Sequence, residues 1–130
     1  MKEQIESISH LEVNKVAIHG KKLKIKNTNT EIILSKNQKK LLLCLMKKIN
    51  EKRVIIEIIW GEGGCNTNEM NYHQLIYKTR KKLVNKGIPE DFIMTIPRYG
   101  LCLNMGFVHQ NTNEQAWLNK SNFSDSEVTE

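Results

Sequence analysis

Apolar and polar residues tend to alternate between positions 13 and 34. Bulky apolar residues stand two positions apart at 16 and 18, at 23 and 25, and at 32 and 34. This period of two is typical of strands that bury one face. Gly20 and the polar residues 27–30 (NTNT) supply turns between the pairs. The pattern predicts a small antiparallel meander, and it leaves the first ten residues unassigned.

The hydrophobic period becomes helical after residue 34. Ser35, followed three positions later by Gln38, has the sequence of a capping box, in which two side chains satisfy free backbone amides. The apolar stripe that follows has helical spacing and comprises Leu41, Leu42, Leu45, Met46 and Ile49. A second, short helix is predicted over residues 52–60, and Trp60 at its end is expected to be buried in the core.

The third predicted helix is the longest. It is expected to begin near Thr67 or Asn68 and to end at Asn85, because Gly87 is a typical stop signal just beyond a helix. Its inward stripe is predicted to be Tyr72, Leu75, Ile76, Thr79 and Leu83. The opposite face of this helix is therefore expected to meet solvent or a partner.

Two further strands are predicted over residues 92–96 and 101–103, as a C-terminal hairpin. A strand meander, three helices and this hairpin make an α+β fold with the order of a winged helix-turn-helix. We expect one such domain over residues 13–108, after an N-terminal extension of residues 1–12. Residues 109–130 are polar and are expected to form a disordered tail.

The formal charge of the chain is +6, and it is unevenly distributed. Residues 111–130 hold one lysine against four acidic residues, a net of −3, which leaves about +9 on the first 110 residues. A domain this basic favours a polyanionic partner, because lysines that face phosphates release condensed counterions. The same charge also suits a soluble protein without such a partner.

Other classes of function find little support in the sequence. The three cysteines, Cys44, Cys65 and Cys102, fit no zinc spacing and the histidines are scattered, so neither a metal site nor a cofactor is expected. No phosphate-binding glycine loop, serine elbow or paired-carboxylate pattern occurs, which argues against an enzyme. The longest apolar run, residues 41–46, is too short to span a bilayer, and no signal pattern occurs at the N-terminus. We expect a soluble cytoplasmic protein with reduced thiols.

Three segments resemble one known family in their order and spacing. Residues 55–61 (IIEIIWG) resemble the second-helix signature of OmpR/PhoB-type DNA-binding domains, and residues 74–83 (QLIYKTRKKL) resemble their recognition helix. Residues 93–100 (IMTIPRYG) resemble the wing of these domains, closest to the ToxR/CadC-like branch. The resemblance covers residues 14–105 and implies a bacterial winged-helix protein that binds specific double-stranded DNA and regulates transcription.

The resemblance implies that the third helix lies in the major groove of DNA. Helix geometry supports this independently, because six residues fall opposite the inward stripe: Met70, Asn71, Gln74, Tyr77, Lys78 and Lys81. The amides of Asn71 and Gln74 can pair with adenine, so these residues are the candidates for base readout. Lys78 and Lys81 suit phosphate or guanine, and Tyr77 suits a phosphate or a thymine methyl group.

The resemblance also implies that the hairpin, over residues 95–103, is a wing that contacts the minor groove or the DNA backbone. Arg98 and Tyr99 are expected at its tip, where an arginine suits the negative potential of the minor groove. Pro97 fixes φ on entry to the turn, and Gly100 is expected to take the positive φ of a tight hairpin.

The chain departs from this family at three positions. The ToxR/CadC-like branch often has a basic residue in place of Tyr99 and a tyrosine in place of Leu101, which predicts weaker or differently aimed wing contacts. Thr79 replaces the leucine that is usual at its position. This exchange is expected to loosen the packing beneath the third helix.

The sequence leaves several roles open. Arg80 is expected either to pair internally with an acidic residue or to touch DNA. The loop that runs from Gly61 to Asn66 is either a plain connector or, as in several relatives, a contact for RNA polymerase. Dimerisation on DNA is compatible with the sequence. The alternative function is a winged-helix module that binds another regulator or RNA polymerase instead of DNA.

Overall fold

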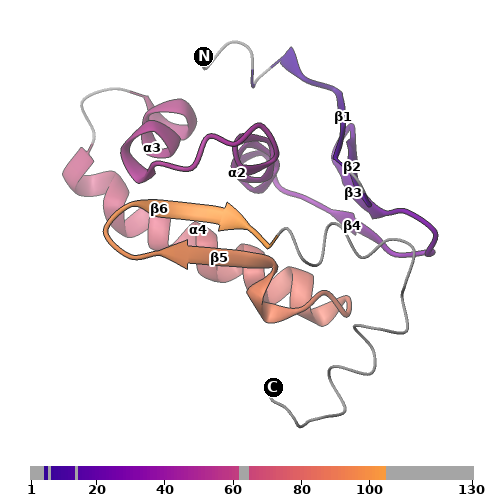
Figure 1. The fold of residues 1–130 in the computed structure, drawn as a ribbon. Helices are drawn as coiled ribbons and strands as arrows, with labels where there is room; N and C mark the ends of the chain where they lie inside the picture. The colour runs from indigo at the N-terminus through magenta and orange to yellow at the C-terminus, as the bar shows by residue number, and fades with distance from the viewer. Residues whose placement is uncertain (1–4, 6, 14, 62–64, 105–130) are drawn as a thin grey trace, which may run out of the picture.

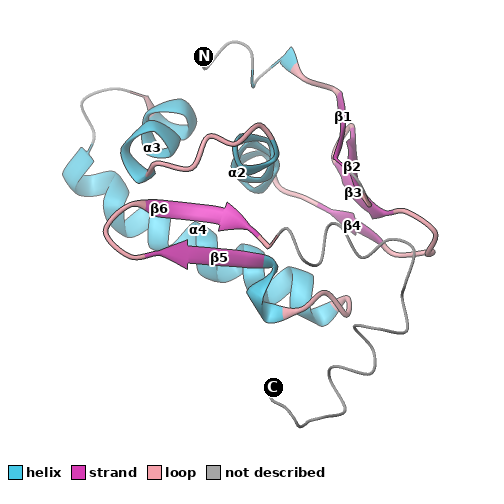
Figure 2. Ribbon diagram, in the orientation of Figure 1, coloured by secondary structure: helices cyan, strands magenta, loops and turns pink. Residues whose placement is uncertain are grey.

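The computed structural model describes residue 5 and residues 7–13, 15–61 and 65–104 (Figure 1). Within these residues the chain has a four-stranded antiparallel sheet, three α-helices and a C-terminal strand pair (Figure 2). Apart from the first strand, the hydrophobic pattern predicts these elements in this order. The α+β class is therefore confirmed.

The N-terminal sheet has the strand order β1-β2-β3-β4, and every neighbouring pair is antiparallel. Its strands are β1 (His10–Val13), β2 (Val16–His19), β3 (Lys22–Ile25) and β4 (Glu31–Ile33). The alternating apolar residues of the predicted meander are all buried: Val16, Ile18, Leu23, Ile25, Ile32 and Leu34. The meander is therefore confirmed over β2, β3 and β4.

Strand β1 begins at His10, within the segment that the sequence leaves unassigned. Its residues alternate only between exposed and half-buried, so four residues carry too weak a pattern to predict a strand. Pairing with β2 orders it, with Leu11 opposite Ile18. Ile5 is only 1% exposed and packs into the same core. Tertiary contacts therefore begin before residue 13, which is the predicted start of the domain.

The three helices begin and end close to the predicted residues. They are α2 (Lys36–Met46), α3 (Lys52–Trp60) and α4 (Cys65–Asn85). The capping box of α2 is confirmed, because the Gln38 amide donates to Ser35 Oγ (3.2 Å) and the Ser35 amide donates to Gln38 Oε1 (2.9 Å). Helix α3 has its predicted bounds, whereas α4 begins two residues before Thr67.

The inward stripe of α4 is confirmed, since all five predicted residues are buried: Tyr72, Leu75, Ile76, Thr79 and Leu83. Thr79 is 0% exposed, and its hydroxyl donates to the carbonyl oxygen of Leu75 (2.6 Å). The polar group at this core position is therefore satisfied within the helix. Trp60 packs against the core but is only half-buried, so it is less enclosed than expected.

The C-terminal hairpin consists of β5 (Ile93–Ile96) and β6 (Gly100–Leu103), and a single 3-10 turn, η1 (Glu90–Phe92), precedes it. Helices α2 and α3 both contact β6, and α3 also contacts α4. In Figure 1 the hairpin runs alongside α4, while the four-stranded sheet lies beyond α2. The hairpin and the exposed face of α4 are therefore available together, away from that sheet.

Candidate nucleic-acid interface

Helix α4 turns a polar, exposed face away from the core. All six residues that the sequence analysis puts opposite the buried stripe are exposed: Met70, Asn71, Gln74, Tyr77, Lys78 and Lys81. Met70 is 67% exposed and Tyr77 is 64% exposed. Both of these side chains are therefore available to a partner.

Local contacts already orient part of this face. Lys81 Nζ lies 5.8 Å from the centre of the Tyr77 ring, a cation–π arrangement between residues four positions apart. Asn71 Nδ2 donates to Asn68 Oδ1 (3.2 Å), so this amide must give up a hydrogen bond before it can pair with a base. The Gln74 amide forms no such bond within the described residues. Of the two residues predicted to read bases, Gln74 is therefore the one whose amide can pair with a base without first losing a hydrogen bond.

Two other cations of α4 point into the protein and hold the helix in place. Arg80 donates to the carbonyl oxygen of Ile93 through Nε (3.1 Å) and Nη2 (2.7 Å), and Nη2 also donates to Thr95 Oγ1 (2.9 Å). Lys82 Nζ donates to the carbonyl oxygen of Ile33 (2.9 Å). Arg80 is therefore an internal link between α4 and β5, although its partners are neutral oxygens rather than the expected acidic residue.

The tip of the hairpin is a tight turn with Arg98 at its strained position. The Tyr99 amide donates to the carbonyl oxygen of Ile96 (3.0 Å), which closes the turn. Arg98 has a φ of 63°, and with Pro97 before it this is the pattern of a type II turn. The prediction that Gly100 takes the positive φ is therefore wrong, because the turn closes one residue earlier.

Gly100 is required by a close backbone approach instead. A Cβ atom at Gly100 would lie 1.8 Å from the carbonyl oxygen of Asn50. The same oxygen accepts the Leu101 amide (2.9 Å), and the Lys52 amide donates to the carbonyl oxygen of Tyr99 (2.9 Å). The segment that enters α3 therefore pairs with β6, and only glycine leaves enough room for this pairing.

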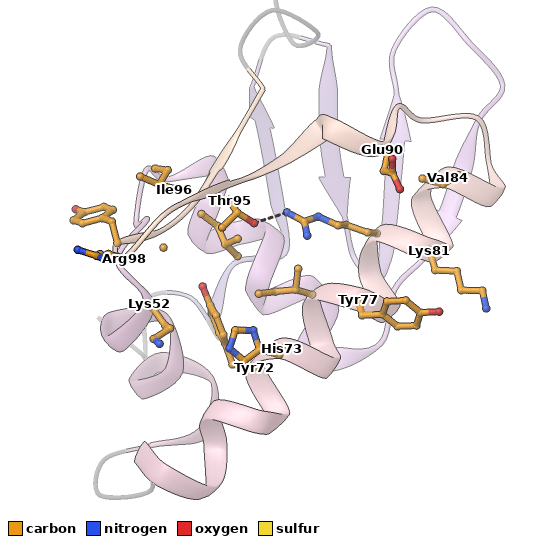
Figure 3. Close-up of a pocket in the computed structure, with 15 residues that line it drawn as sticks. Lys52, Tyr72, His73, Tyr77, Lys81, Val84, Glu90, Thr95, Ile96 and Arg98 are labelled. Carbon is orange, nitrogen blue, oxygen red and sulfur yellow. Dashed lines mark hydrogen bonds between the residues drawn. The ribbon is translucent and has the colours of Figure 1, made fainter.

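A groove of about 620 Å³ lies between α4 and the hairpin (Figure 3). His73 and Tyr77 line it from the helix, and Arg98 and Tyr99 line it from the hairpin. In Figure 3 Arg98 lies at the hairpin end of the groove and Lys81 at the opposite end. Four of the predicted residues therefore border this groove: Tyr77, Lys81, Arg98 and Tyr99. Met70, Gln74 and Lys78 border a neighbouring hollow on α4 instead, and Asn71 borders neither of the two.

The electrostatic balance of this region is positive. Residues 70–89 contain no Asp or Glu. Glu69, just before them, bonds Lys52 Nζ, and this hydrogen bond and the lysine charge lower the pKa of its carboxyl group. Lys78 and Lys81 form no ion pair with any residue that the structure describes. Their charges are therefore available to an anionic partner.

Sequence reasoning missed His73, which is exposed and lines the groove. It also borders a neighbouring hollow on α4 together with Met70 and Gln74. Its spacing of three residues from Met70 and four from Tyr77 is a local signal that could have identified it. Thr95 was also missed, but its contact with Arg80 joins residues far apart in the chain and leaves no local signal.

Two predicted features lie partly or wholly outside the described residues. Residues 62–64 of the loop proposed to contact RNA polymerase are not described, and its last two residues, Cys65 and Asn66, belong to α4. The predicted tail, residues 109–130, is not described at all.

Of the thiols, Cys44 is buried, and desolvation raises its pKa to about 12, which makes the reactive thiolate scarce.

No group of three or more potential metal-ligating side chains occurs in the described part of the chain. None of the helices there is long and apolar enough to cross a membrane. No protein-family model matches the chain, and no curated protein matches it. The comparisons therefore assign no family to the chain.

Proposed function

We propose that this chain is a winged helix-turn-helix protein that binds specific double-stranded DNA and regulates transcription. Helices α3 and α4 form the helix-turn-helix, and the β5–β6 hairpin is the wing. The observation that carries the proposal is that Tyr77 and Lys81, on the exposed face of α4, share one groove with the hairpin tip. No Asp or Glu occurs between residues 70 and 85 of this helix. The resemblance of three segments to OmpR/PhoB-type domains supports the same function.

The dimensions of DNA suit this arrangement. The major groove of B-DNA is about 12 Å wide and admits an α-helix. With α4 in that groove, the neighbouring hairpin tip would meet the adjacent minor groove or its phosphates. Arg98 suits either target, because a guanidinium is attracted to the narrow minor groove and also binds phosphate.

The exposed residues of α4 would have different roles in binding DNA. Gln74 and Asn71 carry the amides that pair with adenine, so they would read bases. Lys78 and Lys81 would contact phosphates, because they are long, cationic and without an internal acidic partner in the described structure. Tyr77, which packs under Lys81, would hold this lysine and contact a phosphate or a thymine methyl group.

The first test is the salt dependence of binding to random duplex DNA. Counterion release predicts that the logarithm of affinity falls linearly with the logarithm of salt concentration. Fluorescence anisotropy with a labelled duplex at several salt concentrations measures this slope. A protein that shows no binding to duplex DNA at low salt would contradict the proposal.

The second test separates specific from general binding. Gln74→Ala should cost about 1–3 kcal/mol on the preferred site and relax the preference at one base pair. Genomic selection of bound fragments would first define that site. Asn68→Ala is a useful companion, because it frees the Asn71 amide without touching Gln74. Equal losses on specific and random DNA would show that Gln74 does not read sequence.

A second candidate function is favoured by the exposure of Met70 and Tyr77 on the same helix face. Apolar side chains of this size are common anchors of protein interfaces, so α4 could instead bind another regulator or RNA polymerase. Met70→Ala would then weaken a protein complex while leaving affinity for random DNA unchanged. Polymerase contact through residues 61–66, dimerisation on DNA and a cytoplasmic location stay predictions.

A further inference from the structure

Two exposed histidines stand directly opposite each other on the β1–β2 strand pair. His10 and His19 are cross-strand partners, and their Nδ1 atoms lie 3.1 Å apart. Their rings meet edge to face, with centroids 5.1 Å apart and planes at 76°. They are nine positions apart in the sequence, so only the pairing of the strands brings them together.

The spacing of these nitrogens is that of two ligands on one metal ion. With metal–nitrogen bonds of about 2.0–2.1 Å, two ligand nitrogens lie about 2.9 Å apart at a right angle and about 3.3 Å apart at the tetrahedral angle. The observed 3.1 Å falls between these values. A metal ion on the open side of the pair would therefore need no change in the separation of the two nitrogens, only a turn of the rings that directs both lone pairs at the ion.

A carboxylate already supports one of the rings. Glu12 Oε2 lies 3.3 Å from His10 Nε2, the ring nitrogen that faces away from His19. The other oxygen of Glu12 accepts a hydrogen bond from Lys26 Nζ (2.6 Å), which holds the carboxylate in place. A carboxylate that accepts the second ring N–H of a ligating histidine fixes the tautomer that leaves Nδ1 free for a metal.

The surroundings leave space for a hydrated ion. The two histidines and Glu12 border a hollow of about 390 Å³ over the outer face of the sheet. The small side chain of Ala17 lies opposite Glu12 on β2 and also borders this hollow. Lys24 and Lys26 also border the hollow, and each pairs with an acid: Lys24 Nζ lies 3.3 Å from Glu31 Oε2, and Lys26 Nζ bonds Glu12. Lys22, the cross-strand partner of His19, pairs with Glu31 as well (Nζ to Oε1, 3.6 Å). The repulsion of a bound cation by these lysines is therefore reduced.

We propose that His10 and His19 form a binding site for a divalent late transition metal. Ni²⁺, Cu²⁺ and Zn²⁺ are the candidates, because imidazole nitrogen is a favourable ligand for these ions. The two Nδ1 atoms are the protein ligands, and water completes the coordination shell, which agrees with the absence of a three-ligand group in the described residues. On binding, the proton between the two Nδ1 atoms moves through solvent to Nε2 of His19, so that both rings are neutral and both Nδ1 lone pairs are free, while the Nε2 proton of His10 stays directed at Glu12. The site is independent of the proposed DNA-binding function.

Isothermal titration of the full chain with Ni²⁺, which does not oxidise thiols, tests the site. His10→Ala and His19→Ala should each weaken Ni²⁺ binding tenfold or more, by about the same factor, because one ion uses both rings. Glu12→Gln should weaken it by about tenfold or less, since it removes support and not a ligand. His73→Ala and His109→Ala are matched controls that keep the wild-type affinity.

Thermal unfolding gives a second readout. Ni²⁺ should raise the melting temperature of the wild-type chain, because a ligand that bridges β1 and β2 binds only the folded state, and EDTA should reverse the rise. The double variant His10→Ala/His19→Ala should fold normally in EDTA and show no rise. Ni²⁺ affinity that the double variant retains, or that the wild type lacks, overturns the proposal and leaves the two histidines as a hydrogen-bonded pair.

Discussion

The four-stranded sheet and the α4–hairpin region are both rich in cations, but they use them differently. In the sheet, Lys22 and Lys24 both lie near Glu31, and Lys26 bonds Glu12. These contacts lower the pKa of both carboxyl groups, chiefly through hydrogen bonds from lysine. On α4, the acid Glu69 pairs with Lys52, and residues 70–85 contain no further acid that could pair in this way. Net charge therefore shows only that a domain is basic. The pairing of charges shows which surface has unpaired cations that can attract an anion.

The same contrast exists within α4. Arg80 and Lys82 are internal links to β5 and β4, whereas Lys78 and Lys81 point outward. All four belong to one short basic run, and only the angle around the helix separates them. A basic run is thus a mixture of cations that bond within the protein and cations that are available to a partner. Substitutions of the first kind should lower stability, and substitutions of the second kind should weaken only binding.

The largest expected effect is at the contact that fixes the hairpin. Gly100→Ala would force a methyl group into the Asn50 carbonyl oxygen and should lower the free energy of unfolding by about 3 kcal/mol. Gly87→Ala is the matched control, since Gly87 has open space and only its positive φ makes alanine cost about 1 kcal/mol. Urea unfolding measures both. Equal losses in the two variants would contradict the steric explanation.

Next in size is the link between α4 and β5. Arg80→Met removes three hydrogen bonds and should cost about 2 kcal/mol of stability, and it should also weaken duplex DNA binding because helix and hairpin lose their fixed spacing. Lys86→Met, an exposed cation of the same region, is the control for loss of charge alone. A DNA affinity that falls equally in both variants would mean that Arg80 acts only through its charge.

A smaller effect, confined to DNA binding, separates the two lysine groups. Lys78→Ala/Lys81→Ala should reduce the log–log salt slope for random duplex DNA by about two, with little change in melting temperature. Lys22→Ala/Lys24→Ala removes the same formal charge from the sheet and should leave the slope unchanged. If both double variants lower the slope equally, the pairing of sheet lysines with Glu31 does not matter for DNA.

The last substitution is at the hairpin tip. Arg98→Gly removes the strain of a positive φ and should leave the free energy of unfolding unchanged or raise it by up to about 1 kcal/mol. The same change should weaken DNA binding, because it also removes the guanidinium. Arg98→Lys keeps both the strain and the charge and serves as the control. Unchanged affinity in Arg98→Gly would mean that the hairpin has only a structural role.

Local features of the sequence determined most of the secondary structure. The meander, the Ser35–Gln38 capping box, the bounds of α3 and the buried stripe of α4 follow from periodicity and caps, which act within one or two turns of chain. The exposed face of α4 follows from the same periodicity. Its proposed role in reading DNA is a prediction from residue chemistry and family resemblance.

Only the tertiary structure decided which residues meet across long separations in the chain. Gly100 is needed because Asn50 approaches it, Arg80 bonds β5 rather than an acidic residue, and His10 meets His19 because β1 pairs with β2. No local pattern encodes such meetings, since each depends on how separate elements pack. For this reason the prediction for Gly100 relied on backbone freedom alone, and the histidines were predicted to be scattered. Both features depend on which residues are neighbours in space. Periodicity gives only the neighbours along the chain.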